Sequence, residues 1–287
     1  MSEIRTLDKN EIPERLFEIP EPPKKLYIRG QMPKANAKFL CVVGSRKYTP
    51  YGKEVCQKLI AGLRGYNIVI VSGLALGIDG IAHTAALDSG LTTIAVPGSG
   101  LSDKVLYPST HKNLAKKIIE SGGALLSEFE PEFRATPYSF PQRNRIMAGL
   151  SHAILVIEAE IKSGTLITSR LGTEYNRDVC AVPGSVFSKN SEGCHMLMRL
   201  GATPITKSEN ILEVLGFEQK QEELPFEEKY KDCSEQELKV VELLKNPQTR
   251  DELIRDLKLS AQEANSLLMI MEIKSLVKES GGELYLA

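Results

Sequence analysis

The sequence predicts a doubly wound α/β domain with a mostly parallel sheet, followed by a small C-terminal domain of helices and a hairpin. Short apolar runs rich in Val and Ile alternate with segments of helical periodicity across residues 37–216. Such runs are typical of parallel strands that helices bury on both faces. Three helix-capping patterns and a glycine-centred hairpin signal follow in residues 233–287. These observations predict two domains of different kinds.

The segment before the first core strand, residues 1–36, is rich in proline and charge. Within it only Tyr27 and Ile28 indicate a short strand, which ends at Gly30. We expect an N-terminal extension without a separate helical domain. The apolar runs that predict the following strands cover residues 39–45, 67–73, 92–98, 124–129, 152–159, 179–184 and 203–206. The segments that predict helices cover residues 51–65, 77–90, 110–123, 143–151, 163–178, 194–202 and 209–216.

The C-terminal part begins after residues 217–232, which are charged, lack periodicity and are expected to form a linker. Three hydroxyl residues then stand at N-cap positions, each with a glutamate three residues later: Ser234 with Glu237, Thr249 with Glu252, and Ser260 with Glu263. Three capped helices followed by a hairpin around Gly281 and Gly282 predict a winged helix-turn-helix over residues 233–287.

The composition excludes several classes of protein. The chain of 287 residues is 42% hydrophobic and 25% charged, as soluble globular proteins are. It contains no apolar run of about 18 residues and no signal-peptide pattern at its start, so we expect a cytoplasmic protein with no membrane contact. Its 5 cysteines include no C-x-x-C pair, which favours free thiols in a reducing compartment. We expect no metal and no cofactor.

The charge is unevenly distributed between the two parts. From Glu218 onward there are 10 Lys+Arg and 16 Asp+Glu, a net charge of −6. Because the whole chain has a net charge of −1, the preceding part carries +5. The asymmetry suggests that the two parts meet different partners.

The loops after the strands matter most, because ligands of a parallel α/β sheet bind beyond the carboxyl ends of its strands. The loop after the first core strand, "GSRKYTPYG", offers Gly44, the Ser45 hydroxyl and the Arg46 guanidinium. A glycine allows close backbone approach, and an arginine matches the geometry of a phosphate. The alternative without a ligand is a surface turn with a solvated arginine.

The loop "SGLALGIDGIAH" follows the next strand and contains Gly73 and Gly77. Its spacing differs from the G-x-G-x-x-G of dinucleotide-binding folds, and no acidic residue ends the preceding strand, which weakens a NAD-binding interpretation. Asp79 lies in the first helical turn, and His83 is expected to pack within the fold rather than to act as a base. Tight helix–strand packing explains part of the glycine content.

Two further loops concentrate cations. In "FPQRNRIMAG", Arg143 and Arg145 flank Asn144 at a helix start, where the helix dipole disfavours positive charge. An anionic ligand would explain them, and the alternative is pairing of an arginine with Glu128 or Glu130. In "KSGTLITS", Lys162, Ser163, Gly164 and Thr165 are suited to form an anion-binding turn at a helix start, although the P-loop pattern is absent.

Together these loops place Arg46, Arg143, Arg145 and Lys162 along one edge of the predicted sheet. Anion sites spread along an edge suit a polyanion better than a single nucleotide. No Ser-His-Asp order, carboxylate pair or metal-ligand spacing forms a catalytic set, so we expect a binding protein and not an enzyme.

Several of these segments occur in the order that is characteristic of one family. "VVGSR", "SGLALGIDGIAH", "LLSEF", "FPQRNRIMAGLS", "VIEAEIKSGTLITS" and "VCAVPGS" resemble the DNA-processing protein A family, DprA, also called Smf. The preceding "PPKKLYIRG" and the C-terminal winged helix are also similar, so that the resemblance covers roughly residues 20–287.

The resemblance implies an extended Rossmann-like domain that binds single-stranded DNA instead of a dinucleotide. It implies phosphate contacts at Ser45, Arg46, Gly73, Lys162, Ser163 and Gly164, a pocket lined by Arg143 and Asn144, and a base or sugar contact at Phe140. With the loop residues above, the predicted nucleic-acid-binding set is Gly44, Ser45, Arg46, Gly73, Gly77, Phe140, Arg143, Asn144, Arg145, Lys162, Ser163, Gly164 and Thr165.

The resemblance also implies a homodimer that acts as a recombination mediator: it protects incoming single strands and loads the RecA recombinase during natural transformation. Two alternatives remain open from the residues. The first is a nucleotide-binding enzyme of the phosphoribohydrolase type, although its "PGGxGTxxE" loop is replaced here by "KSGTLITS" and "LGTE". The second is a regulator that reads duplex DNA through the winged helix, although this domain is acidic and its segment "SAQEANSLLMIMEIKSL" lacks the series of lysines and arginines that a recognition helix uses.

Overall fold

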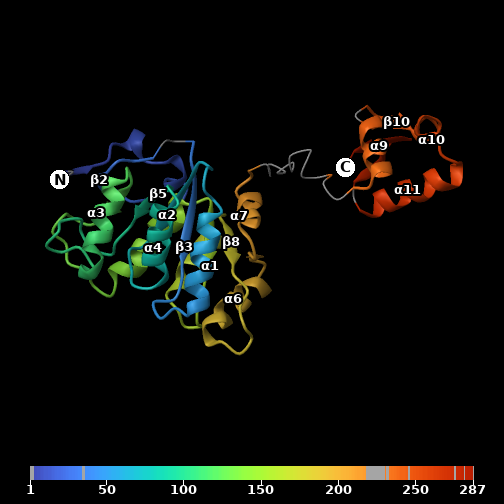
Figure 1. The fold of residues 1–287 in the computed structure, drawn as a ribbon. Coiled ribbons are helices and arrows are strands. Elements are labelled where there is room, and N and C mark those ends of the chain that lie inside the picture. Colours follow the sequence, from blue (N-terminus) through green and yellow to red (C-terminus); the bar gives the residue numbers. More distant parts are fainter. Residues whose placement is uncertain are drawn as a thin grey trace. The chain divides into compact units, whose positions relative to one another are not determined.

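The computed structural model describes residues 3–33, 36–217, 230, 233–244, 246–274, 276–280 and 282–286. The chain divides into two compact units, Met1–Gln219 and Lys220–Ala287. Figure 1 shows an α/β unit and a separate small unit in which helices α9, α10 and α11 are grouped. The linker expected over residues 217–232 lies outside the described residues except at Phe217 and Tyr230.

The α/β unit is built on a nine-stranded sheet with the order β1-β2-β6-β5-β4-β3-β7-β8-β9. The seven strands from β6 to β9 in this order are parallel, and β1 and β2 are antiparallel additions at one edge. The strands are β1 (Ile4–Thr6), β2 (Tyr27–Gly30), β3 (Lys38–Val43), β4 (Ile68–Ser72), β5 (Thr92–Ala95), β6 (Ala124–Ser127), β7 (Ala153–Val156), β8 (Asp178–Ala181) and β9 (Thr203–Pro204). The doubly wound fold predicted from the alternating pattern is confirmed.

Helices cover both faces of this sheet. They are α1 (Pro50–Ala61), α2 (Ile78–Asp88), α3 (Lys112–Glu120), α4 (Ser139–Leu150), α5 (Thr165–Glu174), α6 (Lys189–Arg199) and α7 (Ser208–Val214). Along β3, Leu40 and Val42 pack in one core with α1, α2 and α7. Cys41 and Val43 point the other way into a core with α4 and α6. This alternation explains why the strands are apolar throughout, since neither face meets water.

The strand order creates a switch point beside β3. From β3 the chain moves through β4, β5 and β6 on one side, and it later returns to place β7 on the other side. Helices α1 and α5, which follow β3 and β7, therefore pack on opposite faces of the sheet. The loops that lead into them separate at the carboxyl ends of the two strands, which opens a crevice there.

The N-terminal segment packs more extensively than its sequence indicates. The strand expected at Tyr27 and Ile28 is β2, and β1 extends the sheet beyond it. Leu7, Ile12, Leu16 and Ile19 are buried in the core that includes α4. Ile12, Leu16 and Ile19 have the i, i+4, i+7 spacing of a helix face, but short 3₁₀ turns and extended pieces present them, so the spacing alone would predict the wrong element. Residues 3–30 therefore contribute a sheet edge to the α/β unit.

The C-terminal unit contains α9 (Glu235–Leu243), α10 (Arg250–Leu257), α11 (Ala261–Ile273) and a three-stranded sheet of the order β10-β12-β11. The strands are β10 (Gln248–Thr249), β11 (Val277–Ser280) and β12 (Glu283–Leu286). All three predicted capping boxes are present, at Ser234, Thr249 and Ser260. Three helices followed by a hairpin match the predicted winged helix. In the described part of the chain, no helix has the length and apolar character needed to cross a membrane.

Candidate functional site

A cleft of about 530 Å³ opens at the switch point, between the β3–α1 and β7–α5 loops. The start of α4 and the β4–α2 loop form its floor. The predicted site residues that line it are Gly44, Ser45, Arg46, Phe140, Arg143, Asn144, Lys162, Ser163, Gly164 and Thr165. The other lining residues are Val43, Lys47, Ala75, Asp79, Pro141, Met147, Glu160, Ile167 and Thr168. The fold thus brings together three of the segments that the sequence analysis singled out: the loop with Arg46, the start of α4 and the loop with Lys162.

The β3–α1 loop is held in a fixed shape beneath its cations. The Ser45 hydroxyl donates to the Lys47 carbonyl at 2.9 Å and accepts from the Lys47 amide at 3.1 Å. The β4–α2 loop packs under it at Gly77, which has a φ of 85° and whose absent Cβ would lie 2.4 Å from the Ser45 carbonyl oxygen. Only glycine fits both the backbone conformation and the close approach. The fixed loop leaves the side chains of Arg46 and Lys47 exposed.

The β7–α5 loop faces it and is tied to it directly. The Thr165 hydroxyl donates to the Gly44 carbonyl at 3.1 Å, and the Ser163 hydroxyl accepts from the Thr165 amide at 3.2 Å. Gly164 is the N-cap of α5 and provides no side chain to cap the first amides. The first three amides of α5 already donate to Ser163 and Gly164, so the group that this loop offers to an anion is the exposed Lys162 side chain.

The floor of the cleft holds a buried pair of charges. Arg143 and Asp79 are only 5% and 6% exposed. The Arg143 guanidinium donates to the Val96 carbonyl and, at 3.1 Å from Nε, to Asn144 Oδ1. Burial lowers the pKa of Arg143 and raises the pKa of Asp79, and the attraction between the two charges opposes both shifts. Since an arginine stays charged in proteins, the floor supplies a fixed positive charge that Asp79 partly neutralises.

Gly73 explains how the guanidinium fits there. A Cβ at this position would lie 2.0 Å from Arg143 Nη1, so a side chain would displace the arginine. The Gly73 amide donates to the Asp79 carboxylate at 3.0 Å. Gly73 is therefore beneath the site, not on its surface, and it positions the charged pair.

Phe140 lies at the mouth of the cleft. The Arg46 guanidinium stands over its ring, 5.5 Å from the centroid, and the Tyr107 ring packs against it with centroids 5.6 Å apart. A Cβ on Gly98 would come within 2.6 Å of the Phe140 ring, which shows how closely the backbone supports it. Phe140 is thus placed to orient the Arg46 charge through a cation–π contact.

The lining of the cleft is positive. It has four basic residues, Arg46, Lys47, Arg143 and Lys162, and two acidic residues, Asp79 and Glu160, for a net charge of +2. Arg46, Lys47 and Lys162 are exposed and form no ion pair with any described residue. Charges without a protein partner are available to a ligand, and their placement on two opposing loops suits an extended anion.

Arg145 lies outside the cleft, unlike the other predicted cations. Its guanidinium pairs with Glu128 and donates to the Glu21 carbonyl at 2.5 Å. Both side chains of the pair are 12% exposed. Burial raises the pKa of the Glu128 carboxyl, and the Arg145 charge opposes that rise. The pairing with Glu128 considered from the sequence is therefore the arrangement found, and Arg145 holds the N-terminal segment against α4.

Two lining residues that the sequence analysis did not predict are Met147 and Lys47. Helix spacing could have indicated the first, and its position next to Arg46 the second. Met147 belongs to the same face of α4 as Phe140, Arg143 and Asn144, at the spacing i, i+3, i+4 and i+7. Arg145 does not belong to this face, so the spacing could have predicted that Arg143 and not Arg145 lines the cleft. Lys47 follows Arg46 directly in the same loop, so the pair of adjacent cations could have indicated that Lys47 belongs to the site.

No acid–base pair or metal cluster joins this cleft among the described residues. They contain no group of three or more His, Cys, Asp or Glu side chains placed to hold a metal ion. His83 is fully buried, its Nδ1 is 2.7 Å from the Thr93 hydroxyl, and burial lowers its pKa to about 3. It packs within the fold, as expected, and does not reach the cleft.

The comparisons with known proteins show the family. The sequence profile described as "DNA recombination-mediator protein A" matches residues 3–216. The chain belongs to this family. Protein Smf of Escherichia coli is 41% identical over 210 residues, which are 73% of this chain and 56% of the relative. DNA processing protein DprA of Streptococcus pneumoniae is 42% identical over 202 residues, 70% of each chain. The chain thus spans little more than half of the Escherichia coli relative.

Solved structures of family members have the same fold. The DprA structure from Streptococcus pneumoniae superposes with a TM-score of 0.69 at 39% identity, and covers 76% of this chain and 75% of its own. A DprA structure from Helicobacter pylori, described for its single-stranded DNA binding mode, has a TM-score of 0.65 at 31% identity. It covers 75% of this chain and 98% of its own. The family resemblance found in the sequence motifs is confirmed.

Proposed function

We propose that this chain is a recombination mediator of the family that binds single-stranded DNA in the cleft beside β3 and β7. The observation that carries the proposal is the set of exposed, unpaired cations on two facing loops, Arg46 and Lys47 on one and Lys162 on the other. Successive phosphates of one strand would meet them in turn. The family match and the single-stranded DNA binding of the Helicobacter pylori relative support the same ligand.

A strand fits this site better than a single nucleotide does. The cations lie on both walls and at the floor, so one phosphate cannot contact all of them. The acid at the floor, Asp79, accepts from the Gly73 amide and lies near the Arg143 charge; burial raises its pKa and these two groups oppose the rise, so the carboxyl group is engaged by the protein itself. We therefore propose binding without catalysis, and the phosphoribohydrolase-like enzyme is the alternative that a nucleotide assay would detect.

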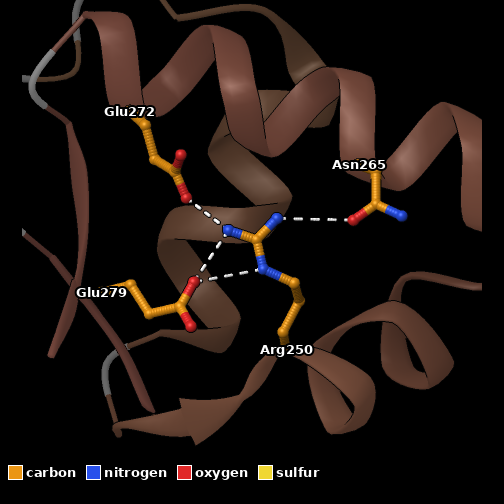
Figure 2. A network of polar contacts seen from close by, with 4 residues as sticks. All are labelled: Arg250, Asn265, Glu272 and Glu279. Atoms are coloured by element: carbon orange, nitrogen blue, oxygen red, sulfur yellow. Dashed lines mark hydrogen bonds and ion pairs between the residues drawn. The ribbon is translucent and has the colours of Figure 1, made fainter. Parts of the chain in front are cut away.

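Duplex DNA readout by the winged helix is less favoured, because Arg250 is occupied by partners within the unit and α11 carries no basic residue. Arg250, at the start of α10, pairs with Glu272 at 2.5 Å and with Glu279 at 2.9 Å, and donates to Asn265 at 3.4 Å (Figure 2). Helix α11, the third helix, contains two glutamates and no lysine or arginine. A helix of this composition would repel phosphates.

Three finer parts of the proposal rest on the resemblance. They are protection of incoming single strands, loading of RecA during natural transformation, and assembly into a homodimer. A RecA-filament assay on strands covered by a single-strand-binding protein tests loading, and sedimentation equilibrium tests the dimer. Faster RecA nucleation with this chain present would support loading, and equal rates would contradict it.

The binding site itself is tested by fluorescence anisotropy of labelled oligo-dT over a salt series. Against wild type, the Arg46→Ala/Lys162→Ala variant loses two phosphate contacts, so its slope of log affinity against log salt should fall by about 1.4, at about 0.7 per contact. Lys58→Ala is the matched control, because Lys58 is exposed near the other end of α1. Equal slopes for wild type and the double variant would overturn the proposal. Release of free base from a nucleoside monophosphate would favour the enzyme.

A further inference from the structure

A second cleft, of about 630 Å³, opens next to the first along the same edge of the sheet. Its lining residues are Thr49, Tyr51, Glu158, Pro183, Gly184, Ser185, Ser188 and Ser191. They come from the start of α1, the segment after β7, the β8–α6 loop and the first turn of α6. None of the functions considered above uses this cleft.

The two clefts share a wall. Lys47 lines the first cleft and Thr49 lines the second, so the β3–α1 loop crosses from one to the other within two residues, at most about 7 Å of chain. The segment after β7 does the same, with Glu160 in the first cleft and Glu158 in the second. The Asn190 side chain donates to the Lys47 carbonyl at 2.8 Å and fixes α6 against this wall. A strand that leaves the first cleft past Lys47 reaches the second one directly.

The second cleft does not suit phosphate. Its lining contains no basic residue and one acidic residue, Glu158, which is 2% exposed. The Glu158 carboxylate accepts from the Thr49 amide at 2.9 Å and from the Thr49 hydroxyl at 2.5 Å, so it is fixed at the start of α1. The negative charge of Glu158 would repel an anion that enters there, whereas it would not repel an uncharged group with N–H donors.

One aromatic ring, Tyr51, lines this cleft, and a second, Phe187, belongs to the β8–α6 loop that forms part of its wall. Phe187 is 95% exposed and lies in the β8–α6 loop between the lining residues Ser185 and Ser188. The Ser185 hydroxyl accepts from the Phe187 amide at 3.2 Å, which shapes the loop tip. Tyr51 is 47% exposed, and its hydroxyl donates to the Pro183 carbonyl at 2.6 Å. An apolar ring so exposed costs solvation free energy unless something covers it, and the anchored Tyr51 ring in the lining offers a second stacking surface.

We propose that the second cleft is a base subsite of the same DNA-binding track. The proposal rests on the function proposed above: the backbone lies along the cations of the first cleft, and one or more bases beyond Lys47 stack on Phe187 and Tyr51. The hydroxyls of Ser185, Ser188 and Ser191 face the edges of these bases. Because stacking tolerates any base, the subsite lengthens the bound strand without imposing a sequence.

Phe187→Ala tests the subsite without disturbing the fold, since the side chain is almost fully exposed. With oligo-dT of increasing length, wild-type affinity should rise in a step when the strand becomes long enough to reach the second cleft. Phe187→Ala should remove that step, a loss of about 5- to 150-fold for a stacked base, and leave the shortest strands bound as by wild type. Phe17→Ala is the control, because Phe17 is an exposed ring of the N-terminal segment that lines neither cleft.

A direct readout separates this proposal from the one on which it rests. Oligonucleotides with 2-aminopurine at successive positions should show quenching at one or two positions with wild type, and recovery of fluorescence there with Phe187→Ala. If wild type binds single strands tightly, and wild type and Phe187→Ala show the same length dependence and the same quenching, the base subsite is wrong and the DNA-binding function stands. Failure of wild type to bind any single strand would overturn the DNA-binding function and the subsite together.

Discussion

Two arginines near helix starts, one in each unit, have opposite surroundings. Arg46 in the α/β unit is exposed, stands over the Phe140 ring and forms no ion pair with any described residue. Arg250 in the C-terminal unit is held by Glu272, Glu279 and Asn265 (Figure 2). The first charge is available to a ligand, and the second is used to join α10, α11 and β11. On the proposed function, DNA binding therefore follows the cations that lack a protein partner, and not the presence of a DNA-binding fold.

Arg143→Met should have the largest effect on stability, since it converts a buried cation of the α/β unit into an apolar side chain. Asp79 would lose its opposing charge and the Val96 carbonyl its donor, so the unit should lose about 3 kcal/mol of unfolding free energy, as when a buried charge is left unpaired. Urea denaturation measures this. In a double-mutant cycle, Asp79→Asn should recover part of the loss. Independent, additive effects would contradict the coupling of the two charges.

A pH change should separate the two units by a smaller amount. All 4 histidines, at positions 83, 111, 152 and 195, belong to the α/β unit. Burial lowers the pKa of His83 to about 3 and that of His152 to about 4. Between these values and the unfolded value of about 6.5, the unfolded chain binds protons that the folded unit does not. The α/β unit therefore loses stability as the pH is lowered.

From pH 7 to 5 the loss for His83 alone should be about 2 kcal/mol. In the C-terminal unit, hydrogen bonds from the caps lower the pKa of Glu252 and Glu263, so their contribution is lost only below about pH 4.5. Hydrogen-exchange mass spectrometry reports both units in one sample. Exchange should accelerate at pH 5, after correction for intrinsic rates, in the α/β unit only. His83→Met should weaken the change, and equal acceleration in both units would count against the assignment.

Removal of one helix cap should destabilise the C-terminal unit by about 1 kcal/mol. In Ser260→Ala the Glu263 amide loses the acceptor that it now has at 3.3 Å, at the start of α11. A thermal melt of the unit's helices measures the effect, with Ser266→Ala as the control because the Ser266 hydroxyl only donates back to the Gln262 carbonyl within the helix. Single-strand affinity should be unchanged, and a parallel loss of affinity would implicate the C-terminal unit in binding.

The smallest expected effect comes from releasing the occupied arginine. Glu272→Gln/Glu279→Gln keeps the side-chain size, removes both negative charges and leaves Arg250 without an ionic partner. Weak, salt-sensitive duplex binding should increase by a few fold, and single-strand binding should not change. In the control, the same two substitutions are combined with Arg250→Gln, and the increase in duplex binding should be smaller. A wild-type protein that already prefers duplex would contradict the comparison.

The sequence predicted the elements of the fold well, because each depends on local pattern. Apolar runs located the parallel strands, and the pairs of hydroxyl and glutamate residues located the three capped helices. The order of the strands and the antiparallel edge made by β1 and β2 depend on pairing between distant segments, which no local pattern encodes. The switch point beside β3, and hence the place where the cations converge, could therefore only come from the structure.

The candidate site was predictable where a residue's role follows from an exposed loop, as for Arg46 and Lys162. It was less predictable on α4, where Arg143 and Arg145 are two residues apart and so point about 200° apart around the helix. One faces the cleft floor and the other faces Glu128. Whether such a residue contacts a ligand depends on which neighbours the fold brings to it.

Photocrosslinking tests most directly whether DNA lies on the α/β unit. Oligo-dT that contains 5-iododeoxyuridine would be irradiated in complex with the full chain, and the adducts mapped by mass spectrometry. The account predicts adducts in the peptides that carry Tyr51, Phe140 or Phe187, at the two clefts along the sheet edge, and none in residues 233–287. Adducts that concentrate in α11 or in the hairpin of β11 and β12 would contradict it.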